Sequence, residues 1–421
     1  MTSIIGFDPT GATDIERWPA LGAPARAEIR AALARAVVRR VATRSGIKVE
    51  LPGGQSFGPP QGPTMVIRNP DAFFTRLGRD GKIGFGEAYM AGDWDSPEVA
   101  DVLEALARHV RSLVPVGTRW LRRFYEARHP LAERNDPRGA KRNISRHYDL
   151  SNDLFSTFLD QSMTYSSALF DDSDERLDHA QGRKIDRVLD VAGVTQGTRV
   201  LEIGTGWGEL AVRAARRGAH VTSVTLSEEQ AAFARRRVRD ADLTAMIDIK
   251  VEDYRDVSGQ FDAIVSVEMI EAVGEEWWPT YFRKLDDLLA PHGKIGIQSI
   301  VMDHAQVMAT RSSWTWIHKY IFPGGRIPSR RAIDDVLAHH TTLRVTDELS
   351  FGESYALTLE RWRHEFAAQA SAIDQLGFDE TFRRMWTFYL AYSEAGFRSG
   401  YLNVVQLAMG REGPPSDSPE R

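Results

Sequence analysis

The most informative segment for the fold is Arg199-Val-Leu-Glu-Ile-Gly-Thr-Gly-Trp-Gly208, an apolar strand that runs into three alternating glycines. Glycine in such a turn lets the backbone bend sharply and come close to a ligand. The spacing Gly-x-Gly-x-Gly differs from the Gly-x-Gly-x-x-Gly fingerprint of dinucleotide-binding folds. The stretch therefore predicts a strand, a ligand-binding turn and a helix, and it favours a ligand without pyrophosphate.

Outward from this turn, short apolar runs alternate with stretches of helical spacing. Regular alternation of this kind indicates an α/β fold with a doubly wound, mostly parallel, Rossmann-like sheet that helices cover on both faces. Strands are predicted at 199–203, 220–225, 247–251, 261–266 and 294–300, and helices at 209–217, 227–239 and 277–289.

A polar segment at 135–143 contains Pro137 and Gly139 and marks a domain boundary. We expect a smaller N-terminal α+β accessory domain at 1–134, a catalytic domain at 135–412 and a polar tail at 413–421. In the accessory domain the sequence predicts helices at 25–45 and 97–114, a strand at 64–67, and tight turns through the glycine- and aromatic-rich stretch 81–94.

Composition excludes several classes of site. The chain of 421 residues has no cysteine, so it has no disulfide, thiolate metal site or cysteine nucleophile. The first residues lack the apolar core of a signal peptide, and no run approaches the roughly 20 apolar residues of a spanning helix. A net charge of −5 argues against nucleic acid. We expect a cytoplasmic protein whose contact with a membrane is peripheral, at its inner face.

Basic residues gather at 108–146, interleaved with Trp120, Phe124 and other apolar side chains. Such a segment is typical of an interface with anionic lipid. It is equally typical of a solvated, arginine-rich linker, and the composition alone does not separate the two interpretations.

Polar residues at the predicted strand ends are candidates for cofactor binding. Glu202 precedes the glycine turn, Thr225 and Gln230 follow the second strand, and Asp253 follows the third. Together with Gly204 and Gly206 they favour S-adenosylmethionine over NAD. For Ser227 a helix cap is the simpler interpretation, and for Asp253 alone the less favoured alternative is a turn residue.

Ordered motifs recur along nearly the whole chain and include His147-Tyr-Asp-Leu-Ser-Asn-Asp-Leu-Phe155, Met163-Thr-Tyr-Ser-Ser167, Ser266-Val-Glu-Met-Ile-Glu-Ala-Val-Gly274 and Gly396-Phe-Arg398. In these motifs the chain resembles the cyclopropane-fatty-acyl-phospholipid synthases. The motif Gly84-Phe-Gly-Glu-Ala-Tyr-Met90 resembles the family's membrane-binding accessory domain. The resemblance implies a class I methyltransferase fold, S-adenosylmethionine and an unsaturated phospholipid in the bilayer.

Within that family, the stretch Tyr392-Ser-Glu-Ala-Gly-Phe-Arg-Ser-Gly-Tyr401 is similar to the actinobacterial branch that makes tuberculostearic-type lipids. This implies methyl transfer to an oleoyl chain, a carbocation, and proton loss to a 10-methylene chain that a separate flavin- or nicotinamide-dependent reductase saturates. Closure to a cyclopropane is the alternative. A methyltransferase for a small soluble nucleophile and a catalytically silent lipid-binding partner also stay open. A homo-oligomer would suit a membrane-surface enzyme.

The resemblance also implies a site for bicarbonate as the base. Its positions fall on Glu271, Tyr355 and the backbone of Ile300, whereas the family's cysteine and histidine are replaced by Ser167 and Gln298. Glutamine can hydrogen-bond an anion but cannot take up charge. Tyr165 and Ser166 fall on cofactor-contacting positions. No metal ligand is assigned, and for His147 a capping or core role is expected.

Glu394 lies in an aromatic segment at 382–397. One hypothesis places it beside the acyl pocket, where it would help to direct proton loss. The alternative is a helix acid that faces solvent. Trp207 and Trp316 are expected to be packing residues.

Overall fold

A computed structural model describes residues 17–22, 24, 28–113 and 151–411. The predicted domain boundary, most of the basic segment 108–146, and His147 lie outside these residues. The described chain forms two compact units. One contains the residues up to 113 with Ser312–Ile321 and Leu359–Tyr401; the other contains the residues from 151 to Arg311 with Phe322–Thr358 and β11.

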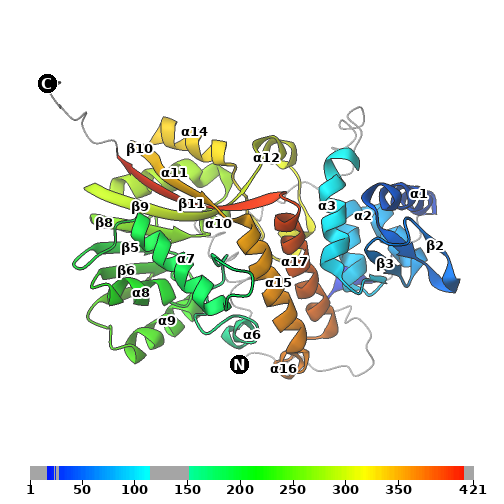
Figure 1. The fold of residues 1–421 in the computed structure, drawn as a ribbon, viewed down its shortest axis with the longest axis horizontal. Helices are drawn as coiled ribbons and strands as arrows, with labels where there is room; N and C mark the ends of the chain where they lie inside the picture. Colours follow the sequence, from blue (N-terminus) through cyan, green and yellow to red (C-terminus); the bar gives the residue numbers. More distant parts are fainter. Residues whose placement is uncertain (1–16, 23, 25–27, 114–150, 412–421) are drawn as a thin grey trace. The chain divides into compact units, whose positions relative to one another are not determined.

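The larger unit is built on a seven-stranded sheet with the order β10-β11-β9-β8-β5-β6-β7 (Figure 1). The five strands from β9 to β7 are parallel, and β11 pairs antiparallel with both β9 and β10. The strands are β5 (Arg199–Ile203), β6 (His220–Thr225), β7 (Ile247–Val251), β8 (Phe261–Val267), β9 (Leu289–Met302), β10 (Leu343–Ser350) and β11 (Leu402–Arg411).

Alternating side chains of the central strands enter two separate cores. In β5, Val200 packs on one face and Leu201 on the other, because successive residues of a strand point to opposite sides. The helices α7 (Leu177–Val191), α8 (Glu209–Arg216) and α9 (Glu228–Asp240) cover the first face (Figure 1). The second is covered by α11 (Trp278–Leu288) and α14 (Arg330–His340). The predicted doubly wound, mostly parallel sheet is confirmed.

Further helices complete this unit. The last of them, α15, begins in the larger unit and ends in the smaller one. They are α6 (Asn152–Ser156), α10 (Ile270–Val273), η5 (Glu275–Trp277), α12 (His304–Thr310) and α15 (Gly352–Ala368).

The smaller unit is α+β, with a four-stranded sheet in the order β2-β1-β3-β4. Ser312–Ile321 and Leu359–Tyr401, distant in sequence, belong to this unit. Its elements are η1 (Pro19–Leu21), α1 (Glu28–Ser45), β1 (Lys48–Glu50), η2 (Pro52–Gly54), β2 (Ser56–Phe57), β3 (Thr64–Ile67), α2 (Pro70–Met90), β4 (Trp94–Asp95), α3 (Val99–Leu113), α13 (Trp316–Tyr320), α16 (Ala370–Gln375) and α17 (Glu380–Arg398).

The prediction of tight turns throughout 81–94 is wrong for most of that stretch. Most of this stretch is the second half of α2, within which the backbone leaves helical geometry only at Gly81, where φ is 56°. A turn with Gly92 at a φ of 74° follows the helix. Tyr89 of the helix is buried, and its ring meets the ring of Trp94 in β4 edge-on, with 5.0 Å between the ring centroids. Burial of large rings thus outweighs the low helix propensity of glycine.

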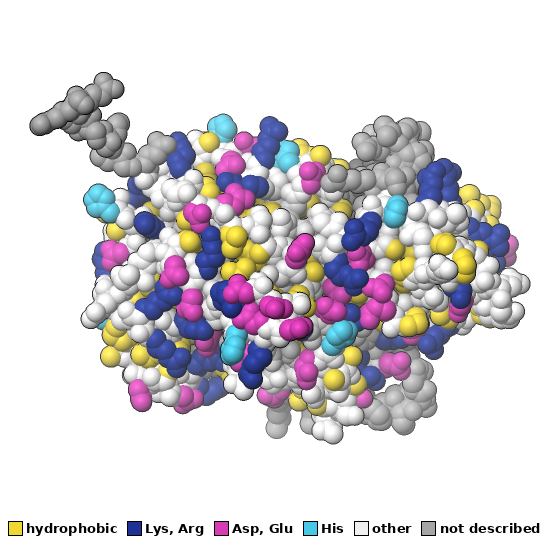
Figure 2. Space-filling view, in the orientation of Figure 1, with side chains coloured by type: hydrophobic (Ala, Val, Ile, Leu, Met, Phe, Trp, Pro, Cys, Tyr) yellow, Lys and Arg dark blue, Asp and Glu magenta, His cyan; other side chains and the backbone are white. Residues whose placement is uncertain are grey.

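Within the described part of the chain, no helix is both long and apolar enough to cross a bilayer. On the face drawn in Figure 2, basic and acidic side chains are interspersed, in keeping with the many ion pairs of the described residues, such as Arg187 with Asp347.

Candidate active site

A cavity of about 150 Å³ opens at the carboxyl ends of β5, β6 and β8. Ligands of open α/β sheets bind at this edge, where the strand order reverses. All eight residues predicted to contact a cofactor line this cavity: Tyr165, Ser166, Glu202, Gly204, Gly206, Thr225, Gln230 and Asp253.

The glycine turn has a geometry that side chains would disturb. Gly204 has a φ of 97°, and a Cβ built on it would lie 2.7 Å from Cγ of Met269. Gly206 has a φ of 51° and no neighbour within 4 Å of such a Cβ. Backbone in this left-handed region is tolerated chiefly by glycine. The turn therefore keeps its backbone bare where it faces the cavity.

Glu202 lies at the end of β5 with 2% of its surface exposed. Its Oε2 accepts a 2.5 Å hydrogen bond from the Ser223 hydroxyl. Burial raises its pKa to about 8. A cationic ligand beside it would favour the ionised form.

The end of β6 is a small hydrogen-bonded unit. The Ser227 hydroxyl caps α9 by accepting from the backbone N–H of Gln230. The Thr225 hydroxyl donates to the side-chain oxygen of Gln230 at 3.0 Å. The helix cap expected at Ser227 is confirmed. Asp253 lines the cavity but also accepts from the backbone and side chain of Arg255, so the turn interpretation describes part of its role.

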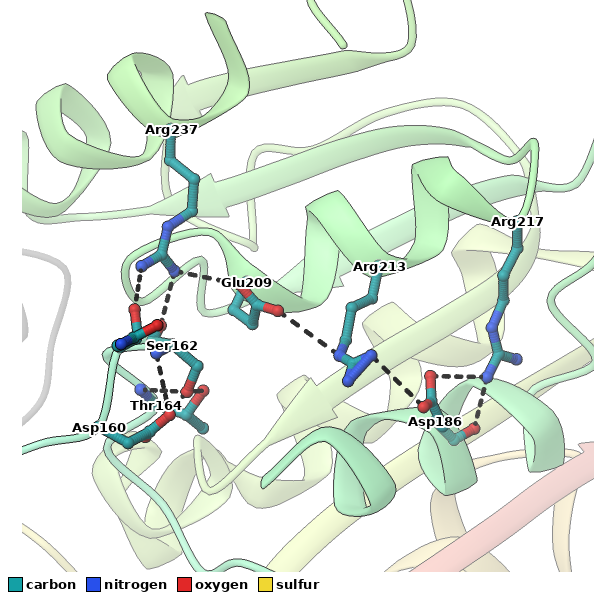
Figure 3. Close-up of polar contacts among 9 residues, drawn as sticks. Asp160, Ser162, Thr164, Asp186, Glu209, Arg213, Arg217 and Arg237 are labelled. Atoms are coloured by element: carbon teal, nitrogen blue, oxygen red, sulfur yellow. Dashed lines mark hydrogen bonds and ion pairs between the residues drawn. The ribbon is translucent and has the colours of Figure 1, made fainter. Parts of the chain in front are cut away.

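The segment before Tyr165 is fastened to two helices (Figure 3). Arg237 of α9 donates to the Ser162 carbonyl at 2.6 Å and lies 3.4 Å from Glu209 of α8. Ser162 in turn hydrogen-bonds Asp160 and Thr164. In Figure 3 the chain of contacts continues from Glu209 through Arg213 to Asp186. This network holds the loop that carries Tyr165 and Ser166.

Lys184 was missed by sequence reasoning. It is fully buried in α7, lines the cavity, and donates a 2.5 Å hydrogen bond to the Ser166 hydroxyl. One turn earlier, Gln181 donates to the Ser166 carbonyl at 2.9 Å. Burial lowers the pKa of Lys184 to about 8. Gln181 and Lys184 stand at helical spacing with the apolar Leu177 and Val188, and two polar residues on that side of the helix were the available signal.

The predicted anion-binding groups meet a carboxylate of the chain itself, Glu268, which was also missed. Its Oε1 accepts from the Ser167 backbone at 2.9 Å and from the Gln298 amide at 2.8 Å, and its Oε2 accepts from the Tyr355 hydroxyl at 2.7 Å. Glu268 lines the cavity and has a φ of 52°, uncommon outside glycine. Burial raises its pKa, and Lys184 and the three donors oppose that rise.

Glu271 lies on the adjoining turn, α10. Its Oε1 accepts from the Ser299 hydroxyl at 2.9 Å and from the Ile300 backbone, whereas its Oε2 has no hydrogen-bond partner among the described residues. Burial, followed by the negative charge of Glu268, raises its pKa to about 8. The structure thus brings Ser167, Gln298 and Tyr355 together around Glu268, and Ile300 with Glu271.

Comparisons with known proteins agree with this geometry. The family model described as mycolic acid cyclopropane synthetase matches residues 135–407. This chain belongs to that family. The tuberculostearic acid methyltransferase UfaA1 of Mycobacterium tuberculosis is 51% identical over 99% of this chain and its own full length. The cyclopropane-fatty-acyl-phospholipid synthase of Escherichia coli is 35% identical over 82% of this chain and 87% of its own.

The solved structures that resemble this chain are class I methyltransferases. The cyclopropane synthase CmaA1, solved as a complex with SAH and CTAB, has a TM-score of 0.59 at 30% identity and covers 64% of this chain and 97% of its own. Coclaurine N-methyltransferase has the same TM-score at 15% identity over 78% of this chain and 99% of its own, which shows the fold alone.

Glu394 is not among the residues that line the cavity. It is 0% exposed, so its interpretation as a solvent-facing acid is wrong. Its carboxylate accepts from Arg363 at 2.8 Å and from Arg398 at 3.1 Å within the smaller unit. Its predicted part in proton loss stays a prediction, and these ion pairs favour a structural role.

The two tryptophans are buried as expected. Trp207 donates a hydrogen bond to the Asn152 side chain at 2.7 Å and also lines the cavity. In the smaller unit Trp316 packs against Phe388, with 4.8 Å between the ring centroids. Among the described residues, no group of three or more metal-ligating side chains lies together.

Proposed function

We propose that this chain transfers the methyl group of S-adenosylmethionine to the cis double bond of an unsaturated, oleoyl-type phospholipid and forms a 10-methylene acyl chain. The observation that carries the proposal is the cavity at the β5 turn, which gathers all eight predicted cofactor contacts. The 51% identity to a tuberculostearic acid methyltransferase over 99% of the chain supports the choice of substrate and product.

The residues of the cavity fit a sulfonium nucleoside. Bare backbone at Gly204 and Gly206 admits close approach, and the buried Glu202 offers a carboxylate to hydroxyl or cationic groups. Thr225, Gln230 and Asp253 supply polar atoms around the same cavity. When bound, S-adenosylmethionine supplies an electrophilic methyl group.

An alkene is a neutral nucleophile, so the site needs alignment and a dry environment more than activation by a base. Methyl transfer leaves a carbocation on the acyl chain, and water must be excluded because it would add to that cation. Aromatic faces stabilise a desolvated cation by about 2 kcal/mol. Tyr165, Trp207 and Tyr254 supply rings at this cavity.

A basic and apolar face of α1 supports peripheral contact with an anionic bilayer. Ile29, Leu33 and Val37 recur every fourth residue and are 80%, 62% and 57% exposed. Residues four apart lie on one side of a helix, and the exposed Arg40 and Arg44 continue that side. Apolar residues beside arginines bind the boundary of anionic headgroups and acyl chains. This face is the proposed membrane contact.

The test combines purified chain, methyl-labelled S-adenosylmethionine and vesicles of dioleoyl phosphatidylglycerol. The expected product is phospholipid heavier by one CH₂ unit, with the NMR signals of an exocyclic methylene. Vesicles of a saturated phospholipid are the matched control and should stay unlabelled. NMR signals of a cyclopropane would show that the alternative product, and not the methylene chain, is formed. Label only in small soluble acceptors, or none, would overturn the proposal.

The same assay addresses the partner and the location. A saturated 10-methyl chain is expected only when a flavin- or nicotinamide-dependent reductase is added, because the methylene product still holds a double bond. Fractionation of cells should place the chain in the cytoplasm and on the inner face of the membrane, with release at high salt. Light scattering of the purified chain tests the expected homo-oligomer.

A further inference from the structure

We infer that Glu268 is the base that removes the proton from the methylated acyl chain, in place of an external bicarbonate ion. The inference rests on the proposed function, because only a carbocation on the acyl chain makes this proton acidic. It concerns one side chain of the β8 strand end, which faces the same cavity as the predicted cofactor contacts.

Three hydrogen-bond donors hold the Glu268 carboxylate from three separate segments. The Ser167 backbone and Gln298 amide reach Oε1, and the Tyr355 hydroxyl reaches Oε2, at 2.7 to 2.9 Å. Burial raises the pKa of Glu268, and the Lys184 charge and these donors oppose that rise and favour the ionised, proton-accepting form. The fixed position of both oxygens also suits a base that must act in one orientation.

The same residues do not fit a bicarbonate ion. The Ser167 amide has one hydrogen and donates it to Glu268, and so does the Tyr355 hydroxyl. Gln298 donates one amide hydrogen to Glu268 and the other to the Ser167 carbonyl at 3.3 Å. Every donor hydrogen of the predicted anion site is therefore used within the chain. A second anion would also lie against the negative charge of Glu268.

The backbone of Glu268 is an independent observation. Its φ of 52° lies in the left-handed region, where a residue with a Cβ is conformationally strained. Glycine would relieve this strain, yet the chain has a glutamate whose side chain is held at the cavity. Strained residues of this kind cluster at active sites.

Glu271 does not compete for this role. Its Oε1 is occupied by Ser299 and Ile300, and burial together with the charge of Glu268 raises its pKa to about 8. Unlike Glu268, Glu271 is not among the residues that line the cavity. Two adjacent carboxyl groups with different surroundings divide into one acceptor and one neutral acid.

The reaction balances with this base. The π electrons of the alkene form a bond to the methyl carbon, and the S–CH₃ bonding pair stays on sulfur as a neutral thioether. A hydride shift moves the cation to the methylated carbon. Glu268 takes one proton of the new methyl group, and the C–H pair forms the exocyclic double bond. The proton leaves the neutral Glu268 for water when the product departs.

The decisive variant is Glu268→Gly, which relieves the strained backbone while it removes the base and frees the three donors. Asp242→Gly is the matched control, because Asp242 has a φ of 57° and is not among the cavity residues. Both variants and the wild type are assayed with dioleoyl vesicles in bicarbonate-free buffer and again with added bicarbonate or formate. SAH binding by calorimetry reports whether the cavity is intact.

Wild type and Asp242→Gly should form methylene lipid equally well with and without bicarbonate. Glu268→Gly should keep SAH affinity, lose methylene product by about 100-fold, and divert the cation to a hydroxylated chain. Added bicarbonate or formate should restore at least part of that loss by entering the freed donor set. A wild type that needs bicarbonate, or Glu268→Gly that stays fully active without it, would overturn the inference. A wild type that methylates no phospholipid would instead reject the proposed function, and this base with it.

Discussion

The ammonium of Lys184 donates a 2.5 Å hydrogen bond to the hydroxyl of Ser166 in the interior of the protein. The contact joins α7 to the loop that carries two of the predicted cofactor contacts. Because the lysine is fully buried, its charge is retained at a desolvation cost, which lowers its pKa to about 8. The cation holds the Ser166 hydroxyl at the lining of the cavity.

Lys184→Met should therefore weaken cofactor binding more than it affects folding. Methionine fills the aliphatic volume but cannot hold the Ser166 hydroxyl, so we expect KM for S-adenosylmethionine to rise about tenfold, the size of one lost hydrogen bond to a charged group. Initial rates at varied cofactor concentration measure this. Lys250→Met, at a half-exposed position of β7, is the control and should leave KM unchanged. An unchanged KM in Lys184→Met would reject the positioning role.

Gly204→Ala should abolish cofactor binding. The new Cβ would meet the Met269 side chain at 2.7 Å in addition to the strain of a φ of 97°. Gly259→Ala separates the two effects, because Gly259 has a φ of 107° and no atom within 4 Å of the new Cβ. Both variants should lose about 1 kcal/mol of stability from strain, and only Gly204→Ala should lose SAH affinity in calorimetry. Equal affinity in the two variants would contradict this prediction.

The pH dependence of stability should depend on Glu271. Its folded pKa of about 8 lies above the ordinary value of a glutamate, so the folded chain holds a proton that the unfolded chain releases. The contribution of Glu271 to the free energy of unfolding is fully present below about pH 4. It is lost as the pH rises through 8, at about 1.4 kcal/mol per pH unit. Glu271→Gln should remove that share of the slope in urea unfolding between pH 5 and 8. A slope identical to that of the wild type would show that Glu271 titrates normally.

Glu394→Gln should destabilise the smaller unit and leave the lipid product unchanged. The neutral amide would weaken the ion pairs with Arg363 and Arg398, and breaking a buried pair costs about 3 kcal/mol. Glu365→Gln, at an exposed position of α15, should change the free energy of unfolding by no more than about 0.5 kcal/mol. A changed product in Glu394→Gln at full stability would restore the hypothesis that this acid directs proton loss.

A negative charge introduced on the apolar face of α1 should weaken binding to anionic vesicles. Leu33→Glu puts a carboxylate in the middle of the exposed apolar stripe, where it would repel anionic headgroups and prevent insertion. We expect about a tenfold loss of binding to anionic vesicles by co-sedimentation, with unchanged SAH affinity. The control Glu28→Gln removes a negative charge from the same helix and should not weaken binding. Equal sedimentation of Leu33→Glu and wild type would exclude α1 as the contact.

The parallel part of the fold could be predicted because its signals are local. The strands β5, β6 and β7 lie where the sequence predicts them, and the polar residues that follow parallel strands meet at one edge of the sheet. For this reason Glu202, Thr225 and Asp253 line one cavity, as expected from their positions at strand ends. The antiparallel strands β10 and β11 were not predicted, since β10 is largely exposed and β11 contains the buried Gln406.

Local sequence is sufficient for the alternation of strands and helices, the glycine turn and the family, because each of these is carried by neighbouring residues. The contact of Glu268 with Ser167 and Tyr355, which lie 101 and 87 positions away, is visible only in the folded chain. It also decided that Glu394 is buried between two arginines of the smaller unit. Pairing and burial of charged groups depend on which distant segments pack together, and the spacing of residues along the chain does not record that.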